Sequence, residues 1–182
     1  MKKLLRTYLP FVANEVKTQL AYRGAFYLWA FISLFSSFIS YFLWMAIYGS
    51  SESGVIGNLT QNEMVVYIFM VYITSSLVSI SVSTWVGYDV VEGRVAMNLI
   101  KPIDYRASLI AQALGDMLYH LVVPSIFIWI GIELYKVFAL GMPVVSLPTL
   151  LLYICSVLMS FLLYVLFDFC FGMLAFFTTY IF

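Results

Sequence analysis

Two ionisable side chains four residues apart, Asp116 and His120, interrupt a long apolar segment. Residues at this spacing share one face of a helix, so the carboxylate can hydrogen-bond the imidazole. Within a membrane such groups are costly unless they face protein or a watery cavity. The pair therefore has two interpretations. One is a polar or proton-sensitive site on a pathway, and the other is a mutually hydrogen-bonded contact that fixes helix packing.

A third candidate, Asp168, lies in the last apolar run, where it is the one charged residue between Leu147 and Phe182. A carboxylate in such a run marks either a functional group or a helix end near water. We expect a helix end here, and therefore a break between a helix that finishes near Phe167 and the start of another.

These residues are not accompanied by the motifs of an enzyme. The sequence has no G-x-x-x-x-G-K-[ST] loop for nucleotide phosphates, no G-x-S-x-G and no H-E-x-x-H, and it has one histidine. Cys155 and Cys170 lie in apolar runs, away from any ligand cluster. We expect no catalytic residue, no metal and no cofactor. An intramembrane enzyme using the three polar residues is the least favoured alternative.

The segment 90–103 is a short charged island between two apolar runs, and in a membrane protein such an island faces water. Gly93 can end a helix, and Pro102 prevents a helix from running straight into the next apolar run. Charges of both signs, to which Asp89, Asp104 and Arg106 add, suit docking against a soluble protein. An ordinary connecting loop is the alternative. The docking candidates are Glu92, Gly93, Arg94, Leu99, Lys101 and Pro102.

The elements that position these residues are membrane helices. Hydrophobic residues make up 64% of the chain and charged residues 10%, against roughly 25% charged in soluble domains. Runs of about 20 apolar residues span a bilayer. We therefore predict an all-α, polytopic membrane protein in one transmembrane domain, 1–182, with the lipid bilayer as a partner. The predicted segments are an amphipathic interfacial helix at 1–23, spans at 24–48, 64–86, 107–132 and 147–167, and a partial fifth span at 168–182.

The basic residues predict the orientation. Eight of the nine lie before the first span or in the loop 87–106, which the positive-inside rule places in the cytoplasm. In the N-terminal helix the apolar residues follow helical spacing, and Pro10 is expected to kink or divide it. The formal net charge is zero, so nothing in the composition favours binding to nucleic acid.

The loop Glu92-Gly93-Arg94 … Leu99-Ile100-Lys101-Pro102-Ile103 resembles the first cytoplasmic loop of type-2 ATP-binding-cassette exporter permeases of the bacterial six-span group. The tail 172–177 is similar to later spans of that group. This resemblance implies a plasma-membrane permease that works by alternating access, with a separate ATPase subunit and a second permease copy or paralogue as partners. The chain ends inside an apolar run, so we expect it to be truncated before the sixth span. A non-transporting scaffold or assembly factor is the alternative function.

Overall fold

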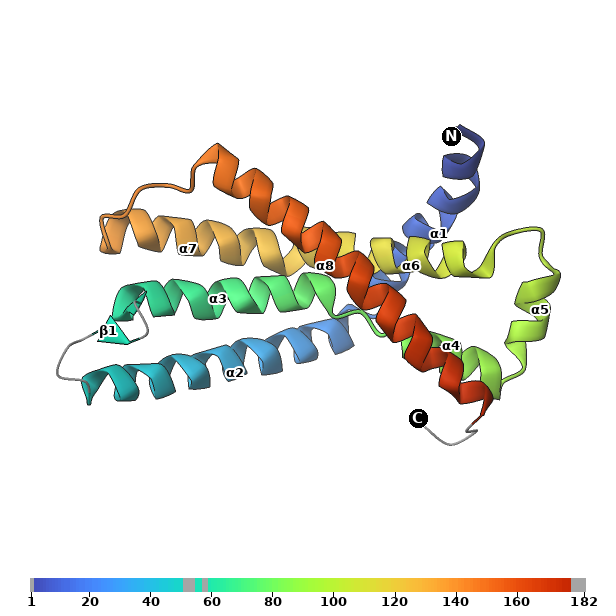
Figure 1. Cartoon of the computed structure of the whole chain (residues 1–182), viewed down its shortest axis with the longest axis horizontal. Coiled ribbons are helices and arrows are strands. Elements are labelled where there is room, and N and C mark those ends of the chain that lie inside the picture. The colour runs from blue at the N-terminus through green and yellow to red at the C-terminus, as the bar shows by residue number, and fades with distance from the viewer. Residues whose placement is uncertain (1, 51–54, 57–58, 178–182) are drawn as a thin grey trace. The chain divides into compact units, whose positions relative to one another are not determined.

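A computed structural model describes residues 2–50, 55–56 and 59–177 (Figure 1). Helices dominate, as predicted, and the strands are a short antiparallel pair, β1 (Val55–Ile56) and β2 (Leu59–Thr60). The chain forms two compact units: residues 1–21, 77–119 and 154–182, and residues 22–76 and 120–153. The helices are α1 (Lys2–Ala21), α2 (Arg23–Gly49), α3 (Gln61–Val78), α4 (Val82–Val91), α5 (Arg94–Ile100), α6 (Tyr105–His120), α7 (Ile126–Ala139) and α8 (Leu147–Met173).

Within the described residues, four helical segments are long and apolar enough to cross a membrane: Ala30–Gly49, Gln61–Val91, Tyr105–Ala139 and Leu147–Phe176. Each contains the greater part of one predicted span. The all-α polytopic class is therefore confirmed. The second, third and fourth segments have 31, 35 and 30 residues, more than the roughly 20 that cross a hydrocarbon core.

The second span differs from the prediction in its middle. We expected one helix over 64–86, but α3 ends at Val78 and α4 begins at Val82. Ser81 stands at the N-cap of α4 with φ −84° and ψ 65°, outside the helical region, and its side chain makes no capping bond. Serine competes with helical hydrogen bonding, and Ser79 and Ser81 flank Ile80 at this position.

The third span is irregular around Pro124. Residues Leu121–Ser125 form a π-helical turn between α6 and α7. Proline has no N–H to donate and its ring clashes with the preceding turn, and a π-helical turn is one way in which a helix accommodates such a residue.

The fourth span corrects the predicted helix end at Asp168. Helix α8 continues through Phe167 and Asp168 to Met173, followed by a 3₁₀ turn, η2 (Leu174–Phe176). The carboxylate does not need water, because it accepts a hydrogen bond from the backbone N–H of Ser83. Residues 178–182 of the predicted fifth span lie outside the described residues.

Helix α1 passes through Pro10 without being divided there. Contacts with the start of the third span hold it on both sides of the proline: the Tyr8 hydroxyl accepts a hydrogen bond from the Asp104 N–H at 3.2 Å, and Gly115 lies against Val12. A Cβ atom at Gly115 would lie 2.6 Å from the Val12 carbonyl oxygen, so the two helices approach at backbone distance. The interfacial position of α1 stays a prediction.

In the other unit, α2 and α3 pack around the aromatic ring of Tyr48, with Met64 and Ile68 buried beside it. The Tyr48 hydroxyl donates to the Leu59 carbonyl at 2.9 Å and so attaches β2 to α2. Helix α3 then begins with a capping box, in which the Glu63 carboxylate accepts hydrogen bonds from the N–H and hydroxyl of Thr60, both at 2.8 Å.

Candidate functional site

The loop between the second and third spans folds into a short helix with a defined turn on each side. Gly93 has φ 70°, a left-handed conformation that glycine adopts without strain, and it separates α4 from α5. Lys101 is extended, at ψ 142°, as expected before a proline, and α5 ends at Ile100. The predicted structural roles of Gly93 and Pro102 are therefore confirmed. Figure 1 shows the resulting reversal of the chain from α4 through α5 to α6.

Asp89 fixes this reversal by accepting three hydrogen bonds. Its donors are Arg94 Nε at 3.0 Å, Asn98 Nδ2 at 2.9 Å and the Tyr105 hydroxyl at 2.9 Å. Two of them come from α5 and the third from the start of α6. The Asp89 side chain is 16% exposed and that of Arg94 54%, so the acceptor lies inside the turn. Sequence reasoning had placed Asp89 among the docking charges, but its contacts are internal.

All six predicted docking residues are exposed. Arg94 also forms an ion pair with Glu92 at 3.0 Å, and Lys101 donates to the Asn98 side-chain oxygen at 2.7 Å. These charged groups therefore already have partners within the loop. Ion pairs this exposed contribute little to stability, so the same groups can exchange partners at small cost.

Sequence reasoning missed two of the exposed apolar side chains of α5. Met97, Leu99 and Ile100 are 68%, 66% and 80% exposed, while Val95 is buried. The helix 94–100 thus carries more apolar side chains than its buried side uses. That excess was the signal available in the sequence. Leu99 was predicted as a docking residue, and the structure adds two further exposed apolar side chains of α5. We call these three residues the α5 patch: Met97, Leu99 and Ile100.

Asp104 lies just before α6, and its side chain caps the start of that helix. Its carboxylate accepts hydrogen bonds from the N–H groups of Arg106 and Ala107, at 2.9 and 3.3 Å. The side chain therefore caps α6, and its own backbone N–H is the donor to Tyr8 of α1. The loop and the N-terminal helix are joined at this residue.

Asp116 belongs to a second polar cluster, and its partner comes from α1. The Gln19 amide donates to the Asp116 carboxylate at 2.6 Å and to Glu15 at 3.3 Å. Asp116 is 6% exposed. Burial, and next the charge of Asp116, raise the pKa of the Glu15 carboxyl, against the opposing effect of the Gln19 hydrogen bond. Gln19 could not be found from the sequence, because 97 residues separate it from Asp116.

His120 is half-buried and directly precedes the π-helical turn. Its predicted pairing with Asp116 stays a prediction. Asp168 is used elsewhere, at the start of α4, where its Oδ2 lies 2.7 Å from the Ser83 nitrogen. Among the described residues, His, Cys, Asp and Glu form no group of three that could hold a metal ion.

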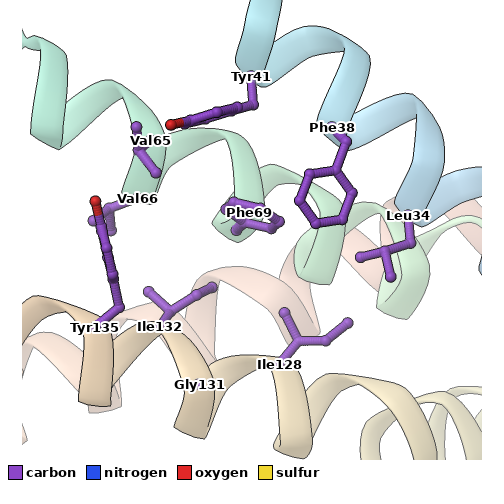
Figure 2. A pocket seen from close by; sticks show the side chains of 10 residues that line it. All are labelled: Leu34, Phe38, Tyr41, Val65, Val66, Phe69, Ile128, Gly131, Ile132 and Tyr135. Carbon is purple, nitrogen blue, oxygen red and sulfur yellow. The ribbon is translucent and has the colours of Figure 1, made fainter.

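One hollow lies in the unit that contains α2, α3 and α7. It has a volume of about 440 Å³. Figure 2 shows apolar side chains from the three helices around it, with Tyr41 and Tyr135 near one end. No residue of the lining is charged, so it offers room for an apolar group and no chemistry on it. The lining residues are Leu34, Phe38, Tyr41, Val65, Val66, Phe69, Ile128, Gly131, Ile132 and Tyr135.

Comparison with known families gives a match over most of the chain. Residues 34–182 match the sequence model of a family described as "ABC-2 family transporter protein". No curated protein and no solved structure matches. The matched range includes most of the first candidate span, all of the other three, the loop with α5, and the polar residues Asp116 and Asp168.

Proposed function

The chain belongs to the ABC-2 family of transporter proteins, and we propose that it is the permease subunit of an ATP-binding-cassette exporter. In this proposal the spans form part of the substrate pathway, and the loop 87–106 couples them to a separate ATPase. The family match favours this function over a scaffold or assembly factor.

The observation that carries the coupling proposal is the α5 patch. A helix of seven residues exposes Met97, Leu99 and Ile100 although Asp89 holds it in one position. Apolar anchors on a preorganised element, surrounded by polar groups, are the usual centre of a protein–protein interface. Here Glu92, Arg94 and Lys101 supply the polar rim. We infer that the patch inserts into an apolar groove of the ATPase.

The proposed partners are a separate ATPase subunit, which would hydrolyse the nucleotide, and a second permease. The match to a transporter family supports the first of them. Four candidate spans enclose a pathway only with additional helices, and a second permease copy or paralogue would supply them. Closure of an ATPase pair on ATP would then displace α5 and change access to the pathway.

The orientation that we propose places the N-terminus and the loop in the cytoplasm, in the plasma membrane. The basic residues argue for this. The hydrogen bond between the Asp104 N–H and the Tyr8 hydroxyl adds support, because it requires α1 and the loop to lie on the same side.

The test compares two equally exposed apolar residues. Leu99 is 66% exposed and Val144, in the connection between α7 and α8, is 65% exposed. We expect Leu99→Asp to abolish co-purification with the ATPase while membrane insertion stays normal, and Val144→Asp to leave co-purification unchanged. A photo-crosslinking residue at Met97 should capture a protein that carries a Walker A sequence. Equal co-purification of both aspartate variants would contradict docking through the α5 patch.

A further inference from the structure

The break in the second span leaves backbone groups that must find partners. The first N–H groups of any helix have no partner within it, and in a bilayer each unsatisfied group costs several kcal/mol. Helix α4 starts at such a break, and the Ser81 side chain does not cap it. The Val82 N–H donates to the Ile80 carbonyl at 3.0 Å and the Trp85 N–H to the Ser81 carbonyl at 3.4 Å, whereas the Ser83 N–H takes its acceptor from another span.

Helix α8 supplies that partner through two residues one turn apart. The Asp168 carboxylate accepts the Ser83 N–H at 2.7 Å. At Gly172, a Cβ atom would lie 2.9 Å from Ser83 Cα and 2.9 Å from Val86 Cβ, so α8 passes α4 at backbone distance. A carboxylate is also the charge that the positive N-terminal end of a helix favours. Figure 1 shows α8 running beside α4.

Several apolar residues close to this contact are fully buried. Ile80, Val82, Val86 and Val165 have exposures of 1%, 0%, 0% and 2%. The start of α4 is therefore held both by a charged hydrogen bond and by close packing against α8. A displacement of α4 at this point has to move α8 as well.

The other end of α4 leads into the loop. Asp89 lies in its last turn and accepts the hydrogen bonds from Arg94, Asn98 and Tyr105 that position α5. Helix α4 has ten residues and is roughly 15 Å long. It therefore links two carboxylate contacts, one with the loop and one with α8.

We propose that Asp168 is a positioning residue that couples the docking loop to α8 by capping α4 at the break in the second span. The proposal rests on the proposed function, since it assigns the route by which movement of α5 reaches the transmembrane helices. Substrate and nucleotide touch neither Asp168 nor Ser83 in this scheme. The carboxylate transmits position, and it does so because the break separates α4 from the helix that precedes it in the same span.

The experiment uses the full chain with its ATPase subunit in nanodiscs of phosphatidylethanolamine and phosphatidylglycerol. The main variant is Asp168→Leu, because removing a carboxylate from a span favours insertion. Asp168→Asn keeps an acceptor oxygen without the charge. Glu63→Gln is the matched control, because Glu63 caps α3 at the other end of the same span. Three quantities are measured: co-purification with the ATPase, stimulation of ATP hydrolysis by the permease, and hydrogen exchange at Ser83.

We expect Asp168→Leu to bind the ATPase normally, to lose the stimulation of hydrolysis, and to exchange the Ser83 amide roughly tenfold faster. Asp168→Asn should fall between Asp168→Leu and the wild type, and Glu63→Gln should match the wild type. A purely structural Asp168 would lower the amount of folded protein but leave stimulation per bound complex unchanged, and that result would overturn the proposal.

If Asp168→Leu does not insert in normal amounts, the Asp168→Asn variant tests the proposal instead. Unchanged stimulation and unchanged exchange at Ser83 in that variant would also overturn the proposal. Failure of the wild-type chain to bind any ATPase is a different outcome. It would contradict the proposed function itself, whereas Ser83 exchange would still report whether Asp168 caps α4.

Discussion

The second span contains the starts of two helices, α3 and α4. Each start is capped by a carboxylate, but the two carboxylates lie at very different sequence separations from the N–H groups that they accept. Helix α3 is capped by Glu63, three residues from Thr60, and helix α4 is capped by Asp168, which is 85 residues from Ser83. Both carboxylates accept a backbone N–H. The first cap needs only its own turn of chain, whereas the second exists only when α8 has packed beside α4. Local caps fix where a helix begins, and long-range caps also fix which helices move together.

The largest expected effect is at the contact between α8 and α4, because the two helices are too close there to admit a larger side chain. We predict that Gly172→Leu destabilises the protein by about 3 kcal/mol, because its side chain must enter space occupied by the backbone of Ser83. Gly131→Ala is the control: a Cβ there meets nothing within 4 Å, and the change should stabilise α7 by about 0.5–1 kcal/mol. Thermal unfolding in detergent, followed by size-exclusion chromatography, measures both. Equal melting of the two variants would mean that α8 and α4 are not in close contact.

Removing the caps compares the two helix starts directly. Asp168→Ala leaves a part-buried N–H without its charged acceptor, and we expect a loss of about 2 kcal/mol in the free energy of unfolding. Glu63→Ala should cost less, because its capping box is exposed and water replaces the lost bonds. Denaturant titration of both variants in the same detergent gives the two values. A larger loss for Glu63→Ala would reverse the comparison.

The same distinction separates what the sequence could predict from what it could not. Gly93 and Pro102 were assigned correct structural roles, because left-handed glycine and the restriction before proline act within two or three residues. The four spans followed from apolar length alone. The end of α8 at Asp168 was wrong, because the donor that allows a carboxylate to stay in the helix lies on another span.

The roles of Asp89 and Gln19 also could not be predicted from the sequence, because they depend on contacts with other elements. Asp89 has the composition of a docking charge, and only its three donors show that it organises the loop. Gln19 lies on a different element from Asp116 and was not considered with it. The α5 patch, by contrast, left a signal in the sequence, since the charged loop also contains the apolar residues Val95, Met97, Leu99 and Ile100, of which Val95 is buried and the other three are exposed.

Asp116 allows a local and a long-range partner to be compared at one side chain. The local candidate is His120, and the long-range partner is Gln19. Two double-mutant cycles, Asp116→Ala with His120→Ala and Asp116→Ala with Gln19→Ala, measure the coupling free energies. We expect about 1–2 kcal/mol for Asp116 and Gln19, which share a 2.6 Å hydrogen bond. The predicted His120 pair should also couple. Additivity in the His120 cycle would refute that pair and leave Gln19 as the measured partner.

The smallest expected effect concerns Glu15, whose neighbours are the local Gln19 and the distant Asp116. Burial and the charge of Asp116 raise the pKa of Glu15 above its usual value of 4.5. The folded state then binds the proton more tightly than the unfolded state. Stability from this group is present below pH 4.5 and is lost as the pH rises through the raised pKa. Glu15→Gln removes the charge but keeps an oxygen that can accept the Gln19 amide. We therefore expect this variant to melt slightly above the wild type at pH 7, with a gap that closes at pH 4. If Gln19 alone governed this carboxyl, its hydrogen bond would lower the pKa, and the variant would instead melt below the wild type at pH 7.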